Sequence, residues 1–111
     1  MAVTAEIQRI VRNALAEDIG TGDVTSVPII APTARLEGDF LVKARGVIAG
    51  LGIVGEVFAQ VDPSIAYAPM VEDGTLASPG DIVARVAGAG PGILIAERTA
   101  LNFLQRMSGI A

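Results

Sequence analysis

The chain has 111 residues, enough for one domain with a modest core, and 51% of them are hydrophobic. It contains no histidine and no cysteine, which excludes thiol nucleophiles, histidine-dependent triads, a disulfide framework and nearly all zinc sites. A net charge of −4 with a single lysine argues against a nucleic-acid partner, and because neither a membrane-spanning stretch nor a secretory signal pattern is present, we expect a cytoplasmic protein without a membrane partner.

The N-terminal half begins with an amphipathic helix and continues into a strand. From Thr4 to Glu17 apolar residues recur at helical spacing, and Thr4 is a suitable N-cap. Glycine, aspartate and threonine at positions 18–26 predict a loop. From Leu36 to Arg45 apolar and charged residues alternate, which predicts a strand with one buried face, and residues 46–50 continue as a short buried strand or bend.

The C-terminal half alternates between helix and strand patterns. We expect a helix at 53–61, a strand at 65–71, an isolated apolar contact at Leu76, a strand at 82–86 and a terminal helix at about 92–107, with turns between them. This order of elements predicts an α+β fold in which about four strands form a layer with helices on one side.

The terminal helix carries the strongest candidates for a binding site. Its polar face presents Arg98, Asn102 and Gln105, with Thr99 and Arg106 beside them, so the first three side chains can point at one ligand. A guanidinium binds a carboxylate through two parallel hydrogen bonds, although spacing alone favours a solvated arginine. The opposite apolar arc predicts packing against a large surface and consists of Leu94, Ala96, Ala100, Leu101, Phe103, Leu104 and Met107.

Glu97 falls inside the apolar arc of this helix, where an unpaired charge is costly. We therefore expect it to pair with an arginine, either Arg85 or one from another domain. Arg106, at the edge of the polar face, is expected to have a structural or interface role.

Two further patterns suggest ligand sites that we do not favour. Glu17, Asp18 and Asp23 form an acidic cluster, but the glycines and threonine among them indicate a turn in which such side chains cap backbone groups. Residues 50–55 match Gly-x-Gly-x-x-Gly, the dinucleotide fingerprint, without the strand context and the later acidic residue that the fingerprint requires.

Four stretches, in this order along the chain, resemble the quinolinate phosphoribosyltransferases, the carboxylating nicotinate-nucleotide pyrophosphorylases. They are Leu15-Ala-Glu-Asp-Ile-Gly-Thr-Gly-Asp-Val-Thr25, Gly46-Val-Ile-Ala-Gly50, Val71-Glu-Asp-Gly-Thr-Leu-Ala-Ser-Pro-Gly-Asp81 and Glu97-Arg-Thr-Ala-Leu-Asn-Phe-Leu-Gln-Arg-Met-Ser-Gly-Ile-Ala111. The resemblance extends over almost the whole chain. It implies that residues 1–111 form the family's N-terminal open-faced sandwich, and that the terminal helix leads to a C-terminal α/β barrel which is missing here.

The resemblance also implies an activity for the whole enzyme. Family members convert quinolinate and phosphoribosyl pyrophosphate to nicotinate mononucleotide, pyrophosphate and carbon dioxide in NAD biosynthesis. The Mg²⁺ that they use is expected to bind to the missing barrel, and we expect no metal or cofactor within this chain, which alone should be inactive.

Subunit pairing in the family places the N-terminal domain of one subunit over the barrel mouth of the next. The resemblance therefore implies a homodimer or higher homo-oligomer in which Arg98 contacts quinolinate in trans at the dimer interface. Asn102 and Gln105 either touch the substrate as well or form a polar rim of the domain interface.

Two other functions remain open. A paralogous phosphoribosyltransferase, either molybdenum-transport-associated or specific for nicotinate, would share these N-terminal motifs. A non-catalytic biotinyl- or lipoyl-like module would share the turn-and-strand pattern of residues 71–84. Such modules carry their cofactor on a lysine at a hairpin tip, whereas Lys43, the only lysine, is expected within a strand.

Overall fold

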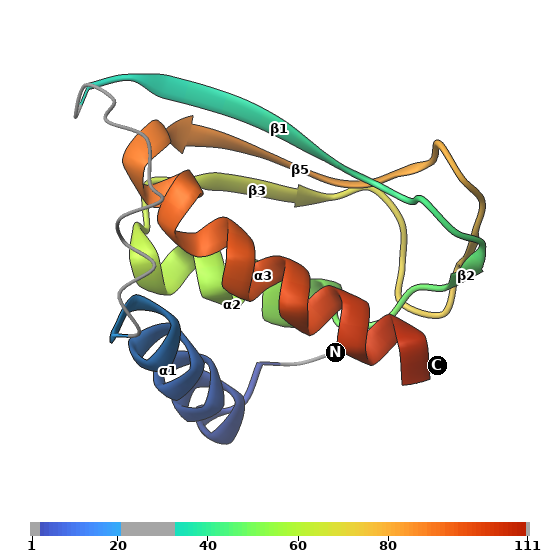
Figure 1. Ribbon diagram of the computed structural model, residues 1–111, viewed down its shortest axis with the longest axis horizontal. Coiled ribbons are helices and arrows are strands. Elements are labelled where there is room, and N and C mark those ends of the chain that lie inside the picture. The colour runs from blue at the N-terminus through green and yellow to red at the C-terminus, as the bar shows by residue number, and fades with distance from the viewer. Residues whose placement is uncertain (1–2, 21–32, 111) are drawn as a thin grey trace.

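Three helices lie on one side of a small antiparallel sheet in the computed structural model, which describes residues 3–20 and 33–110 (Figure 1). The helices are α1 (Ala5–Gly20), α2 (Leu51–Val61) and α3 (Gly90–Ile110). Strands β1 (Arg35–Leu41), β5 (Ile82–Ala89) and β3 (Ala66–Pro69) form a sheet in the order β1-β5-β3, and β2 (Gly46–Val47) pairs with β4 (Leu76–Ala77). The expected α+β layer, with its helices on one side, is confirmed.

The central strand β5 gives the sheet one buried and one open face. Ala84 and Val86 point toward the helices and are almost fully buried, and Phe40 of β1 lies opposite Ala84 on the same face. On the other face Arg85 lies opposite Asp39, and their side chains form an ion pair of 3.3 Å that is about half exposed. The sandwich is therefore open-faced, as the family resemblance implied.

An aromatic cluster joins α2 to the buried face of the sheet. Phe58 is 1% exposed, and its ring lies 6.0 Å from that of Phe40 and 6.1 Å from that of Tyr67, measured between centroids. Gly55 makes room for this packing, since a Cβ there would lie 2.9 Å from a ring carbon of Tyr67. The Tyr67 hydroxyl donates a hydrogen bond of 2.7 Å to the carbonyl oxygen of Leu51 at the start of α2.

Tyr67 should make the domain sensitive to alkali. Burial, and secondly the nearby Asp73 carboxylate, raise the pKa of the Tyr67 phenol above its model-compound value of 10.0. Folding thus stabilises the neutral phenol. Its contribution to the free energy of unfolding is complete below about pH 10 and is lost as the pH rises above that value. We expect Tyr67→Phe to lose about 1 kcal/mol of stability at neutral pH and to show a shallower decline above about pH 10 in urea denaturation. Equal alkaline losses in the two proteins would contradict this assignment.

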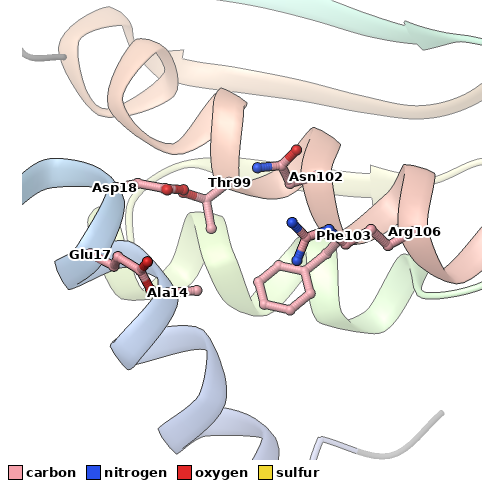
Figure 2. Close-up of a pocket in the computed structure, with 7 residues that line it drawn as sticks. All are labelled: Ala14, Glu17, Asp18, Thr99, Asn102, Phe103 and Arg106. Atoms are coloured by element: carbon pink, nitrogen blue, oxygen red, sulfur yellow. The ribbon is translucent and has the colours of Figure 1, made fainter. Parts of the chain in front are cut away.

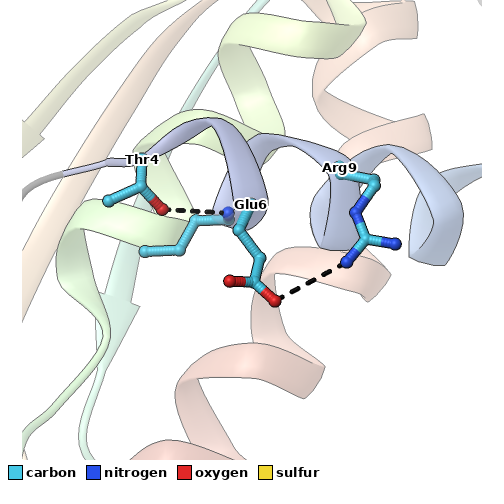
Figure 3. Close-up of polar contacts among 4 residues, drawn as sticks. Thr4, Glu6 and Arg9 are labelled. Atoms are coloured by element: carbon cyan, nitrogen blue, oxygen red, sulfur yellow. Dashed lines mark hydrogen bonds and ion pairs between the residues drawn. The ribbon is translucent and has the colours of Figure 1, made fainter.

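The three predicted helices are present, and each is longer than its pattern. The Thr4 hydroxyl caps α1 as expected, accepting a 3.2 Å hydrogen bond from the Ile7 backbone N–H (Figure 3). In the first turn Glu6 and Arg9 form an exposed ion pair of 3.6 Å, a type of contact that adds little stability. Within the residues that the structure describes, no helix is long and apolar enough to cross a membrane.

Two expectations about the strands were wrong. The strand predicted at 36–45 ends at Leu41, because the pairing register with β5 shifts after Phe40, and Lys43 therefore lies in the bend before β2. Leu76 is not an isolated apolar contact: it pairs with Val47 in the β2–β4 ladder, and its side chain is 53% exposed. Both errors arise from pairing partners that are distant in the sequence.

Candidate functional site

The apolar side of α3 is fixed against α2 and the sheet. Four residues that recur at helical spacing are buried: Ile93, Ala96, Ala100 and Leu104. The last three belong to the predicted apolar arc. Leu94, Leu101, Phe103 and Met107, the other members of that arc, are half-buried. This packing determines which face of α3 is exposed.

The C-terminal part of α3 is tied to the junction between β2 and α2. The Ser108 hydroxyl accepts a 3.1 Å hydrogen bond from the Ala49 backbone N–H and lies 3.3 Å from the Ala49 carbonyl oxygen. Met107 packs on Gly50, whose φ of +96° is in the left-handed region; a Cβ there would lie 2.8 Å from the Met107 sulfur.

A protein carboxylate occupies the N-terminus of α2. Asp73 accepts hydrogen bonds of 3.1 Å from the backbone N–H groups of Gly50 and Leu51, one on each carboxylate oxygen. In a dinucleotide-binding fold, a phosphate would bind at this helix end. The first and last glycines of the Gly-x-Gly-x-x-Gly match, at 50 and 55, instead make room for the Met107 and Tyr67 contacts.

The three predicted site residues are all exposed on α3, and two of them line different hollows. Asn102 lines a small hollow of about 140 Å³ between α3 and α1. Gln105 lines a trough of about 480 Å³ on the opposite flank, between α3 and residues 40–48. Arg98 lines neither of these two hollows. Because each residue of a helix is rotated by about 100° from the one before, Arg98 projects from α3 between Asn102 and Gln105. Arg98 and Asn102, or Arg98 and Gln105, can therefore reach one ligand more readily than all three together.

The small hollow is bordered by a partly buried hydrogen bond that the sequence did not reveal. Thr99, expected beside the polar face, is 1% exposed, and its hydroxyl donates to the Asp18 carboxylate of α1. Figure 2 shows this pair facing across the hollow, with the Arg106 side chain directed from α3 toward the same space. The only local signal in the sequence was the position of Thr99 between the buried residues Ala96 and Ala100.

The acidic cluster expected near the end of α1 does not appear as a metal site in the described part of the chain. Asp18 accepts the Thr99 hydrogen bond from another helix, and the turn that it was expected to cap lies outside the described residues. Asp23 lies outside the described residues. Within residues 3–20 and 33–110, no group of three or more carboxylate, histidine or cysteine side chains is arranged to hold a metal ion.

Glu97 does not pair with Arg85, contrary to one of the two expectations. Arg85 forms its ion pair with Asp39 on the open face of the sheet. Glu97 is exposed and lines a hollow of about 310 Å³, which shares Phe40, Leu41, Lys43 and Leu101 with the trough on that flank. Because water solvates its carboxylate, Glu97 does not need an internal cation.

The exposed face of α3 offers cationic and amide donors, which suit the recognition of an anion. Arg98 supplies a planar guanidinium with parallel donors, and Asn102 or Gln105 supplies an amide on either side. Arg106 follows Arg98 by about two helical turns, about 12 Å along the axis, so it projects from a different part of the helix.

Comparisons with known proteins give one consistent family. The profile described as "Quinolinate phosphoribosyl transferase, N-terminal domain" matches residues 23–108. The chloroplastic carboxylating nicotinate-nucleotide pyrophosphorylase of Arabidopsis thaliana is 41% identical over 109 residues, which are 97% of this chain and 31% of that protein. A probable carboxylating nicotinate-nucleotide pyrophosphorylase of Bacillus subtilis is 33% identical over 106 residues, 96% of this chain and 36% of that protein.

A solved structure agrees in fold as well as in sequence. The crystal structure of NadC from Streptococcus pyogenes superposes with a TM-score of 0.89 at 31% identity, covering 99% of this chain and 40% of that chain. The chain thus spans about a third of the length of the curated relatives it matches.

Proposed function

The chain belongs to the quinolinate phosphoribosyl transferase family, as its N-terminal domain, and from this premise we propose that it is the substrate-lid and dimerisation domain of an enzyme that makes nicotinate mononucleotide. That enzyme would combine quinolinate with phosphoribosyl pyrophosphate and release pyrophosphate and carbon dioxide. In this proposal the chain supplies Arg98 in trans to a quinolinate molecule held in the barrel of an adjacent subunit. Residues 1–111 would be inactive alone, and the oligomer would be a homodimer or a larger homo-oligomer.

The exposure of Arg98 on a fixed helix is the observation that supports this proposal most directly. Quinolinate is a planar dianion with two neighbouring carboxylates, and an arginine guanidinium matches a carboxylate through two parallel hydrogen bonds. The role of Arg98 would be positioning and electrostatic stabilisation, without proton transfer. Either Asn102 or Gln105 would add a contact, depending on which flank of α3 faces the substrate.

The remaining parts of the reaction centre would come from the barrel. The described residues do not present a set of ligands for Mg²⁺. The family resemblance assigns the metal, and the groups that bind phosphoribosyl pyrophosphate, to the barrel domain. The large apolar content of this chain fits a domain that packs against such a neighbour.

Mixed subunits of the intact enzyme test the contact in trans. One variant carries Arg98→Ala, and the other carries an inactivating change in its own barrel site. Each should be inactive as a homodimer, while the equimolar mixture should recover about a quarter of the wild-type activity, because half of the dimers are hybrids with one complete site. A mixture without activity would place Arg98 in cis or away from the site, and would overturn this part of the proposal.

Substrate choice provides an independent check. The same enzyme should use quinolinate and release carbon dioxide. Activity with nicotinate alone, or a molybdenum-linked function without phosphoribosyl transfer, would instead assign the chain to a paralogue.

A further inference from the structure

One hydrogen bond between side chains joins the end of α1 to the middle of α3. The Thr99 hydroxyl donates to the Asp18 carboxylate, 81 residues away in the sequence, across the small hollow of Figure 2. Thr99 is the one polar side chain among the described residues that is buried, with 1% exposure. A threonine inside a helix often bonds to the preceding turn of its own helix. This threonine makes a tertiary contact instead, and that contact needs an explanation.

The hydrogen bond acts on the flank of α3 that faces α1, away from the tight packing of α3 against α2. On the side of α2, Ala96 and Ala100 are fully buried, and this contact fixes the distance between the two helices. On the side of α1, the helices are separated by a hollow of about 140 Å³. The Asp18–Thr99 pair spans this hollow, so it limits the rotation of α3 about its own axis.

Rotation of α3 matters because Arg98 precedes Thr99 by one residue on the same turn. A rotation of about 10° moves a group that lies about 6 Å from a helix axis by about 1 Å. A displacement of about 1 Å in a positioning group can cost up to ~100-fold in rate. A bond that is too weak to matter for overall stability can therefore matter for the placement of a guanidinium.

We propose that Asp18 and Thr99 are positioning residues for Arg98. The carboxylate accepts, the hydroxyl donates, and the resulting bond holds the turn of α3 that carries Arg98 in the orientation that reaches substrate. An ionised acceptor makes this bond stronger than one between neutral groups. The inference rests on the proposed function, because it has a consequence only if Arg98 contacts the substrate.

The test compares Thr99→Val with Thr99→Ser in the intact enzyme. Valine keeps the branched shape but cannot donate, whereas serine keeps the hydroxyl. We expect Thr99→Val to raise KM for quinolinate ~5–10-fold while KM for phosphoribosyl pyrophosphate stays unchanged, and Thr99→Ser to remain within ~2-fold of wild type. Asp18→Asn retains an oxygen acceptor and should resemble Thr99→Ser.

Ser108→Ala is the matched control, because it removes another tertiary hydrogen bond of α3, to Ala49, ten residues from Arg98. This control should lower Tm without a change in KM for quinolinate. If Thr99→Val behaves in the same way, the pair has only a structural role and the inference is overturned. Arg98→Ala, measured alongside, separates this inference from the proposed function. If Arg98→Ala is impaired and Thr99→Val has a normal KM for quinolinate, only this inference is overturned. If Arg98→Ala is itself normal, the proposed function is overturned.

Discussion

Replacing Arg98 with alanine is expected to lower kcat/KM for quinolinate roughly 10²–10³-fold in the enzyme that carries this domain. The guanidinium would form a bidentate pair with a carboxylate inside a site from which the barrel excludes water, and truncation would leave that carboxylate unpaired. Arg98→Lys keeps the charge but loses the planar pair of donors, so it should recover only part of the activity. Steady-state kinetics and calorimetric titration with quinolinate measure the two effects.

Arg106→Ala is the appropriate control for this prediction. Arg106 is exposed on the same helix and carries the same charge, yet it lies about 12 Å farther along the axis. Its removal should change the general electrostatic field as much as the removal of Arg98 does, with at most ~3-fold effect on quinolinate affinity. If the two variants lose equal activity, the effect of Arg98 is long-range attraction and direct contact is excluded.

Gly50→Ala is expected to destabilise the domain by about 2–3 kcal/mol. One part of this cost is the backbone, because φ at Gly50 is +96°, a conformation that disfavours any Cβ. The other part is steric: the new Cβ would lie 2.8 Å from the sulfur and 3.3 Å from the Cβ of Met107. The sulfur can swing aside, but the Met107 Cβ is attached to α3, so the helix itself must shift. Urea denaturation monitored by circular dichroism measures the loss.

Gly74→Ala separates the backbone cost of an added Cβ from its steric cost. Gly74 has almost the same φ, +95°, but no atom lies within 4 Å of the position its Cβ would take. It should therefore lose only the backbone part, about 1 kcal/mol. Combining Gly50→Ala with Met107→Ala should give less than the sum of the single losses, since the contact with the Met107 sulfur is then absent. Equal losses for the two glycine variants would show that Met107 adjusts freely.

The helices of this domain were predictable because their signals are local. An amphipathic repeat and a capping threonine lie within a few residues of each other, and α1 begins where Thr4 predicted. The strands were less predictable because their partners are distant. β2 and β4 have two residues each, and nothing within those residues indicates that they pair. The end of β1 at Leu41 depends on a register shift against β5, which no alternating pattern reveals.

In the candidate site, too, features set by local sequence were predictable and features set by distant partners were not. Exposure of Arg98, Asn102 and Gln105 followed from helical projection alone. Their distribution over different hollows did not, because it is set by what packs on each flank of α3: α1 on one side and residues 40–48 on the other. Thr99 was misplaced for a related reason, since a hydroxyl is buried only where a partner exists, and its partner comes from α1. A substrate for Arg98 could be suggested only by family resemblance, because a helical arginine on its own is most often solvated.

Helix α3 is attached to its surroundings by two polar contacts, from Thr99 near its middle to Asp18 and from Ser108 near its C-terminus to Ala49, and its apolar side is buried. A helix restrained in this way cannot swing open as an independent gate. If product leaves a site that α3 covers, the whole domain must move as a rigid body about a hinge outside these contacts. Turnover would then depend on the stiffness of an interdomain connection, and spectroscopic labels on α3 and α1 should keep a constant separation throughout the cycle.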